Sequence, residues 1–439
     1  MKLNYKRTTI IGFAFLSICA FWQLYDGIVP LILKNTFNIG DTVAGGIMAL
    51  DNILALFMLP LFGTLSDKTS SRIGKRMPYI IGGTALAVIS MNFLPFGDNT
   101  FNLTLFIVAL FIALVSMSTY RSPAVALMPD VTPKPLRSKA NAIINLMGAL
   151  GGAFTLIMIK LLVPASGKPD YTPLFLVISG LMVFSVLVLI LVVNENKLVE
   201  EMKAIDGHGN DEEETTRLND EESVSEKTTS GKSNALPKDV KKSLIFILMS
   251  IFFWFMAYNA VTTAFSKYVQ SFLGVAGGGF ASNLLVATGV AIISYIPVAF
   301  IASKIGRRKT ILIGITMLFV SFSVAYFFTT YTPILTVILA LVGAGWAAIN
   351  VNSYPMVVEM AKGSDVGKYT GYYYTFSMAA QILTPILSGA LLEFVGYRTL
   401  FPYAAFFMVL AFCTMLMVKH GDSKPIPPKD KLEIMDAGD

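Results

Sequence analysis

The chain alternates between long apolar segments and short polar loops. The segments are long enough to cross a hydrocarbon core of about 30 Å as helices. Twelve of them lie at about 8–33, 42–65, 78–97, 102–128, 139–163, 173–194, 243–272, 281–303, 310–329, 332–360, 367–393 and 399–419. The 439 residues are 54% hydrophobic and only 14% charged, which is typical of a polytopic membrane protein. The pattern therefore predicts an all-α membrane protein with twelve transmembrane helices.

Lysine and arginine gather in alternate loops between these segments. If both termini lie in the cytoplasm, 28 of the 34 Lys and Arg fall on the inner side. Inner loops of membrane proteins carry this excess of positive charge. We therefore predict cytoplasmic termini and a multi-pass location in the cell membrane.

A change in composition divides the twelve segments into two groups of six. The stretch 195–242 is rich in acidic, Ser and Thr residues and includes Asp211-Glu212-Glu213-Glu214. Such a stretch cannot bury an apolar core, so we expect a disordered cytoplasmic linker. The predicted domains are a six-helix bundle at 1–194, this linker at 195–242, a second six-helix bundle at 243–419 and a cytoplasmic tail at 420–439.

A short hydrophilic hairpin at 63–78 joins the second and third apolar segments. It holds Asp67 among four bases, with Gly63 and Gly74 at its turns and Pro78 opening the next segment. A weaker copy, Ser303-Lys304-Ile305-Gly306-Arg307-Arg308-Lys309, occupies the corresponding place in the second half. The two hairpins indicate an internal repeat of the kind found in transporters.

The first hairpin resembles the signature loop of the major facilitator superfamily. The run S-D-K-T-S-S-R-I-G-K-R-M-P-Y at 66–79 is most similar to plant sucrose transporters and their bacterial relatives, near the glycoside-pentoside-hexuronide cation symporters. The run R-S-P-A-V-A-L-M-P-D at 121–130 resembles the end of the fourth helix in sucrose transporters. The resemblance implies two pseudo-symmetric six-helix bundles that transport a solute by alternating access.

The chain departs from these relatives at their ion-coupling positions. The acid that sucrose transporters carry in the fourth helix is matched here by Leu114, and their arginine after the proline is matched by Val125. The paired acids of melibiose-type symporters are matched by Ala55 and Leu59. Neither a sucrose-type proton site nor a melibiose-type sodium site therefore transfers residue by residue.

Three ionisable residues lie inside the apolar segments of the first half, namely Asp26, Asp51 and Arg121. Ionisable groups in a membrane need a partner, a water-filled cavity or a function. A carboxylate surrounded by apolar groups takes up a proton more readily and releases it when its surroundings change. We therefore expect Asp26 or Asp51 to couple transport to a cation, with a proton favoured and sodium left open. For Arg121, contact with the substrate and a structural ion pair are both open.

Aromatic and amide side chains recur inside the apolar segments of both halves. A sugar offers an apolar ring face and a rim of hydroxyls, so its site needs rings beside groups that donate and accept hydrogen bonds. We predict a neutral sugar, such as the disaccharides sucrose or maltose, as the substrate. The predicted contacts are Trp22, Gln23, Tyr25, Asp26, Asn52, Tyr120, Arg121, Asn145, Trp254, Tyr258, Asn259, Asn350, Tyr354, Tyr373 and Gln381.

The resemblance further implies that the hairpins latch the two bundles together. We expect Asp67 to face the start of the eleventh helix near 368–371, where free N–H groups attract an anion. Arg72 and Arg76 would hold Asp67 or pair with Asp130. The residues assigned to this latch are Gly63, Asp67, Arg72, Gly74, Arg76, Asp130, Arg137, Arg307, Arg308 and Glu359.

Two alternatives to sugar import stay open. Proton-driven efflux of an amphiphilic compound would use the 21 Met and 32 Phe as an adaptable surface, and a non-transporting membrane sensor would use the linker as its output. The sequence shows no nucleophile–base pairing, metal cluster or phosphate-binding loop, so we expect neither an enzyme nor a cofactor or metal. The net charge of +6 is explained by the loops and does not indicate nucleic acid. The predicted partners are the sugar, H⁺ or Na⁺ and the lipid bilayer, and the protein is expected to be a monomer.

Overall fold

The computed structural model describes residues 3–133, 136–202, 237–360 and 366–422. Within them, twelve helices or helix pairs are long and apolar enough to cross a membrane, and no strand occurs. The predicted all-α architecture with twelve spans is therefore confirmed. The first half contains α1 (Tyr5–Asn35), α2 (Asp41–Met48), α3 (Leu50–Lys68), α4 (Met77–Asn99), α5 (Leu103–Asp130), α6 (Arg137–Leu162) and α7 (Thr172–Val192). The second half contains α9 (Lys238–Ser271), α10 (Gly279–Ile305), α11 (Arg307–Ala325), α12 (Pro333–Val358), α13 (Val366–Phe394), η4 (Tyr397–Thr399) and α14 (Leu400–Leu416).

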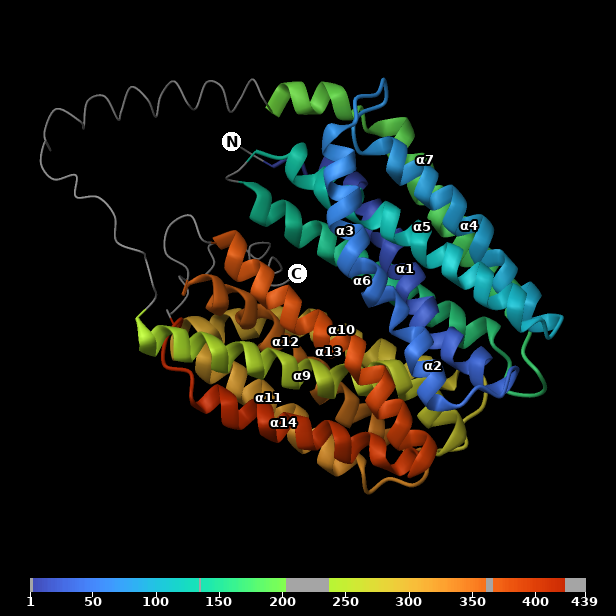
Figure 1. Ribbon diagram of the computed structural model, residues 1–439, viewed down its shortest axis with the longest axis vertical. Coiled ribbons are helices and arrows are strands. Elements are labelled where there is room, and N and C mark those ends of the chain that lie inside the picture. The colour runs from blue at the N-terminus through green and yellow to red at the C-terminus, as the bar shows by residue number, and fades with distance from the viewer. Residues whose placement is uncertain (1–2, 134–135, 203–236, 361–365, 423–439) are drawn as a thin grey trace, which may run out of the picture.

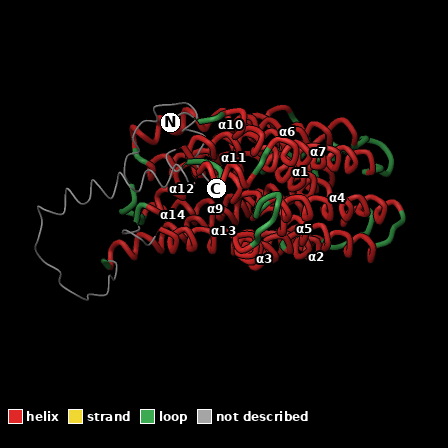
Figure 2. Tube along the Cα trace, turned by 90° about the horizontal axis from the view of Figure 1, so that it is seen from above, coloured by secondary structure: helices red, strands yellow, loops and turns green. Residues whose placement is uncertain are grey.

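The two halves repeat the same pattern of helix packing. In the first half α1 packs against α6 and α7, α5 packs against α3 and α4, and α4 packs against α7. Six spans later, α9 packs against α13 and α14, α12 packs against α10 and α11, and α11 packs against α14. Figure 1 shows the halves as two groups of helices side by side, and Figure 2 shows their helices running along a common direction. This repetition is the pseudo-symmetry expected from the two hairpins.

The second span is interrupted where the sequence predicted one helix. Ala49 separates the eight-residue α2 from α3. The hydroxyl of Tyr25 in α1 donates to the carbonyl oxygens of Met48 at 3.1 Å and Ile47 at 3.4 Å beside this interruption. A side chain therefore satisfies backbone acceptors at the junction of the two helices, as buried carbonyls require.

The described ends of the predicted linker are helical, where the sequence predicted disorder. Residues 195–202 are helical, and α9 begins at Lys238, so both described ends of the stretch 195–242 include helix. Residues 203–236 lie outside the described residues, and the domain boundaries stay a prediction. We refer to the end of the helices that holds Tyr5 and Leu416 as the inner end, following the predicted topology.

Glu195, which the sequence assigned to the linker, is 1% exposed and binds the first hairpin. Its carboxylate accepts hydrogen bonds of 2.9–3.1 Å from the backbone N–H groups of Lys75, Arg76 and Met77. These are free donors at the start of α4, where the helix dipole also favours an anion. Gly74 has φ +115°, and a Cβ there would lie 2.1 Å from Glu195 Oε2. The hairpin therefore needs glycine at position 74 to accept the carboxylate.

We expect Glu195→Ala to lower the free energy of unfolding, because it removes the acceptor of three N–H groups, two of them buried. The cost should be about 1–3 kcal/mol, as for buried donors left without a partner. Thermal unfolding of the purified protein in detergent measures it. Glu201→Gln is a suitable control, because the side chain of Glu201 is 45% exposed. Its ion pair with Arg7, at 3.6 Å, is near the surface and therefore contributes little to stability. Equal stabilities for the two variants would contradict the assignment.

Candidate functional site

A buried group of charges joins the two halves at the outer end. The carboxylate of Asp41, at the start of α2, contacts Lys267 Nζ at 2.7 Å and Lys34 Nζ at 3.2 Å. The hydroxyl of Tyr397 donates to the same carboxylate at 2.7 Å and also contacts Lys34. The side chains of Asp41 and Lys267 are only 5% and 6% exposed. We call Lys34, Asp41, Lys267 and Tyr397 the outer cluster.

Backbone contacts close the same end tightly. A Cβ at Gly45 of α2 would lie 1.9 Å from the carbonyl oxygen of Pro385 in α13, and one at Gly389 would lie 2.3 Å from that of Asp41. These glycines allow α2 and α13 to touch main chain to main chain. On the other side, Gly278 N–H donates to the Val163 carbonyl at 3.2 Å. The halves are therefore in direct contact at the outer end.

A cavity of about 1100 Å³ lies between the halves on the inner side of this contact. Side chains of α1, α3, α5 and α6 line it from the first half, and side chains of α9, α10, α12 and α13 line it from the second. It extends to Pro129, the last residue but one of α5, at the inner end. The cavity is large enough for a drug-sized or disaccharide-sized ligand.

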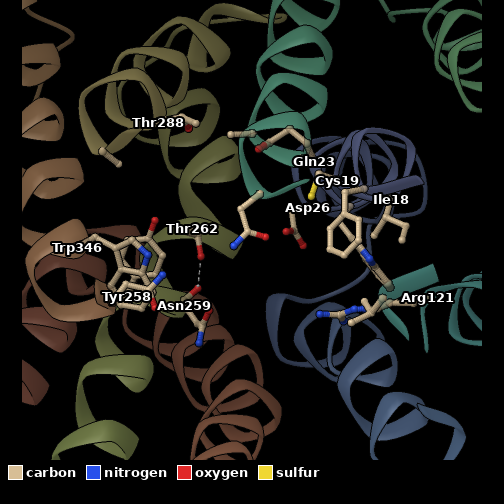
Figure 3. Close-up of a pocket in the computed structure, with 18 of the residues that line it drawn as sticks. Ile18, Cys19, Gln23, Asp26, Arg121, Tyr258, Asn259, Thr262, Thr288 and Trp346 are labelled. Carbon is tan, nitrogen blue, oxygen red and sulfur yellow. Dashed lines mark hydrogen bonds between the residues drawn. The ribbon is translucent and has the colours of Figure 1, made fainter. Parts of the chain in front are cut away.

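The two walls of the cavity carry different chemistry (Figure 3). On the second half, the rings of Tyr258 and Trp346 stack in parallel with centroids 3.7 Å apart, next to Asn259. On the first half, Gln23 and Asp26 extend from α1, and Arg121 lies on α5. The cavity therefore presents the ring stack with amides on one side and charged groups with amides on the other.

About half of the predicted sugar contacts line this cavity. They are Trp22, Gln23, Asp26, Arg121, Asn145, Tyr258, Asn259 and Asn350. The structure brings them together from α1, α5, α6, α9 and α12, which places residues of both halves around one space. Their contact with a substrate stays a prediction.

The other predicted contacts lie outside the cavity lining, and most are occupied within the protein. Tyr120 is fully buried, where its hydroxyl bonds Ser17 at 2.6 Å and donates to the Ala14 carbonyl at 2.9 Å. Trp254 is also fully buried. Aromatic residues at these positions pack helices together rather than face the open space. The remaining residues outside the lining are Tyr25, bonded to Ile47 and Met48; Asn52, bonded to Asp51; Tyr373, bonded to Ser353; Tyr354, bonded to Thr370; and Gln381.

The sequence analysis missed Trp346, which forms half of the ring stack. Trp346 lies one helical turn before Asn350 in α12, so both side chains reach the same face. That spacing was the available signal. The neighbouring Gly343 and Gly345 are typical of a segment that packs against another helix. Nothing in the sequence identifies Tyr258 as the ring partner of Trp346.

The first hairpin is organised around Arg76, whose side chain is 5% exposed. Its guanidinium pairs with Asp130 at 2.9 Å and with Asp67, and it also donates to Ser66 and the Gly63 carbonyl. The predicted pairs of Arg76 are thus present within the first half. The side chain of Asp67 is 59% exposed and forms an ion pair with Arg76. The contact predicted between Asp67 and the start of α13 is not among the contacts of the described residues.

The remaining latch residues make contacts within their own halves. Arg307, at the second hairpin, forms an ion pair with Glu359. The Arg308 side chain donates to the Leu416 carbonyl at 2.6 Å, and Arg137 donates to the Thr132 carbonyl at 3.3 Å. The carbonyl of Arg72 accepts from Asn196. The described polar contacts between the halves lie at the outer end instead, and the latch role stays a prediction.

The sequence pattern of the Major Facilitator Superfamily matches residues 11–304 and 281–435. The chain belongs to this superfamily. Two curated relatives are similar over part of their length: an uncharacterized symporter of Synechocystis sp. is 29% identical over 148 residues, and an MFS-type transporter of Metarhizium majus is 26% identical over 122 residues. These matches cover 31% and 28% of this chain but only 27% and 26% of the relatives.

Solved superfamily structures share the fold at low sequence identity. A nucleoside transporter, NupG, is 17% identical with a TM-score of 0.67, covering 95% of this chain and 100% of that one. A bacterial homologue of the iron transporter ferroportin in an inward-facing state is 12% identical with a TM-score of 0.67, covering 94% and 99%. A POT family transporter in complex with 5-aminolevulinic acid is likewise 12% identical with a TM-score of 0.67, covering 93% and 94%. These likenesses show that the chain shares the fold of these transporters.

We expect Asp41→Asn to separate the two halves at the outer end more often, because Lys267 loses its buried partner. Breaking a buried ion pair costs about 3–5 kcal/mol, and about 1.4 kcal/mol is tenfold in an equilibrium. In a Cys413→Ser background, the rate at which a membrane-impermeant maleimide added outside labels the cavity residue Cys19 should rise about tenfold or more. Asp170→Asn, in the exposed turn before α7, is the control. An unchanged labelling rate in Asp41→Asn would show that the outer cluster does not hold the end closed.

Proposed function

We propose that the protein is a secondary active transporter that imports a sugar together with a cation by alternating access. The observation that carries this proposal is the central cavity, which is lined by side chains of both halves. It places the Tyr258–Trp346 ring stack opposite Gln23 and Asp26. A pyranose ring packs its C–H face on aromatic rings while its hydroxyls bond amides and carboxylates. The rings and polar groups therefore suit a hydroxylated ring compound.

A disaccharide that is neutral overall, such as sucrose or maltose, fits this arrangement best. Asn145, Asn259 and Asn350 add amides that both donate and accept, which suits hydroxyl groups more than a charged ligand. The name of the Synechocystis relative describes a symporter, and this supports cation-coupled import over efflux. Asp26 and Asp51 supply the carboxylates that coupling requires.

Movement of the two halves about the cavity provides the transport step. Access from outside requires the outer cluster and the α2–α13 contact to separate, while the contacts of Arg76 keep the first half intact at its inner end. Because packing repeats between the halves, each half can tilt as a unit around a ligand at their interface.

Uptake by the purified protein in liposomes tests this function. A panel of sucrose, maltose, glucose and lactose is offered under an inward proton gradient, an inward sodium gradient and no gradient. We expect accumulation of an α-linked disaccharide under one of the cation gradients. Accumulation of none of the sugars, combined with gradient-driven extrusion of an amphiphilic dye, would replace import by efflux.

We expect Trp346→Ala to raise the KM for the transported sugar about tenfold, since it removes one ring of the stack and about 1–1.5 kcal/mol of contact. Trp346→Phe keeps an aromatic face and should lose less. Phe327→Ala, a side chain 75% exposed just after α11, is the matched control and should transport as the unmodified protein does. A KM that does not respond to Trp346→Ala would remove the ring stack from the sugar site.

A further inference from the structure

A second cavity, of about 250 Å³, lies between α11 and α14 on the surface of the second half. It shares no lining residue with the central cavity. The two helices pack against each other, and Figure 1 shows them on the side of the second half that faces away from the first. Neither helix lines the central cavity, so their exposed face meets the bilayer. The lining of this α11–α14 groove consists of Ile315, Thr316 and Phe319 from α11 and Met408, Val409 and Phe412 from α14.

The surface of the α11–α14 groove is apolar. Five of the six lining side chains are apolar, and the hydroxyl of the sixth, Thr316, donates to a backbone carbonyl of its own helix at 2.8 Å. Ile315 and Met408 are fully buried, whereas Phe319 and Val409 are exposed beside them. A polar ligand would lose its hydrogen bonds to water in such a groove, and a hydrocarbon chain has none to lose. The groove therefore suits a hydrocarbon chain.

The depth of the groove matches one leaflet of a bilayer. At 1.5 Å per residue, Ile315 and Phe319 lie about 12 and 18 Å from the start of α11. Phe412 and Met408 lie about 6 and 12 Å from the end of α14, which is at the same inner end. Half of the hydrocarbon core is about 15 Å thick. An acyl chain whose head group lies at the inner end therefore runs along the groove.

Two lysines stand at the inner end of the groove. Lys309, in the first turn of α11, is exposed and lies two turns before Thr316 on the same side of the helix. Lys419, just after α14, is also exposed. Within the described part of the chain, neither lysine side chain has an ion pair or a hydrogen bond. Arg308, next to Lys309, donates to the last two carbonyls of α14 at 2.6 and 3.4 Å. Its guanidinium thus covers acceptors that would repel an anion.

The acids at this end are bound to other groups. Glu359 forms an ion pair with Arg307, and Asp422 accepts from the backbone N–H of Arg308 at 2.8 Å. The two lysines are therefore left to balance a charge from outside the described chain. Inner ends of membrane helices carry an excess of bases in general. Here the unpaired bases also stand at the mouth of an apolar groove, which is the combination that a phospholipid offers in reverse.

We propose that the α11–α14 groove binds an anionic phospholipid, with one acyl chain in the groove and the phosphate beside Lys309 and Lys419. The acyl chain alone would not distinguish one phospholipid from another, whereas the two lysines favour a negatively charged head group. A lipid in this position contacts α11 and α14 together and so stabilises the second half. The site lies away from the central cavity and does not depend on which solute is transported.

Native mass spectrometry of the delipidated protein in a neutral detergent tests the head-group preference. The protein is titrated with phosphatidylglycerol and, separately, with phosphatidylcholine that has the same acyl chains. We expect the first phosphatidylglycerol to bind about tenfold more tightly, because bases near a membrane surface attract anionic lipids. The double variant Lys309→Gln, Lys419→Gln should lose this preference and bind phosphatidylcholine as before. Lys304→Gln, which removes an exposed base at the end of α10, is the matched control and should keep the preference.

A second pair of variants tests the groove itself. Val409→Trp places a large side chain in the groove and should weaken the binding of both lipids, and phosphatidylglycerol should no longer raise its unfolding temperature. Val324→Trp, at an exposed position near the outer end of α11, should respond to the lipid as the unmodified protein does. If Val409→Trp does not fold, the lysine variants still decide the proposal.

Three results would overturn the proposal. Equal affinities for the two lipids in the unmodified protein, or an equal loss of preference in Lys304→Gln, would reduce the lysines to part of a general positive charge. Stabilisation by inorganic phosphate to the same extent would assign them to a small anion. A dimer that forms in the delipidated protein and is lost in Val409→Trp would assign the groove to a second copy of the chain.

Discussion

A charge within the membrane-spanning helices must have either a partner or access to water, and this requirement organises the structure. Asp98, at the outer end of α4, has a fully buried side chain that accepts from Thr36 at 2.5 Å and lies 3.6 Å from Lys168. Asp41 is paired with Lys267 across the halves. Both carboxylates have a structural role, because each one is paired with a lysine of the protein. Asp26 and Arg121 instead face the cavity, which is why the proposed function is assigned to it.

The halves are in direct contact at the outer end and surround a cavity at the centre. At the outer end, main-chain contacts of Gly45 and Gly389 are combined with a buried ion pair. In the middle, side chains of both halves surround a space that a ligand can fill. A ligand that touches both walls can compensate for contacts that are lost when the outer end opens, which is the energetic condition for alternating access. The repeated helix packing lets each half stay rigid during that change.

Much of this could be read from the sequence, and the remainder depends on tertiary contact. Run length fixes the twelve spans because bilayer thickness sets helix length, and the hairpin residues Asp67 and Arg76 pair because they are close in the chain. Lys267 and Asp41 are 226 residues apart, and each looks like a loop charge at a helix end. Glu195 was assigned to the linker by composition, although it caps α4. Such partners are decided by folding rather than by local pattern.

The interruption of the second span lies between the outer cluster and Asp51. The eight residues of α2 span about 12 Å at 1.5 Å per residue, with Asp41 at one end and Asp51 just beyond the other. Its outer part is bound to α13, whereas its inner end meets α3 at Ala49 and the hydroxyl of Tyr25. A helix that belongs to the first half by sequence is thus held by the second half in space. If the halves separate as proposed, strain would concentrate at Ala49, because a short rigid helix cannot follow both partners at once. Tyr25 and Asp51 flank that point, so the interruption lies between a hydroxyl that binds the end of α2 and a carboxylate in the first turn of α3.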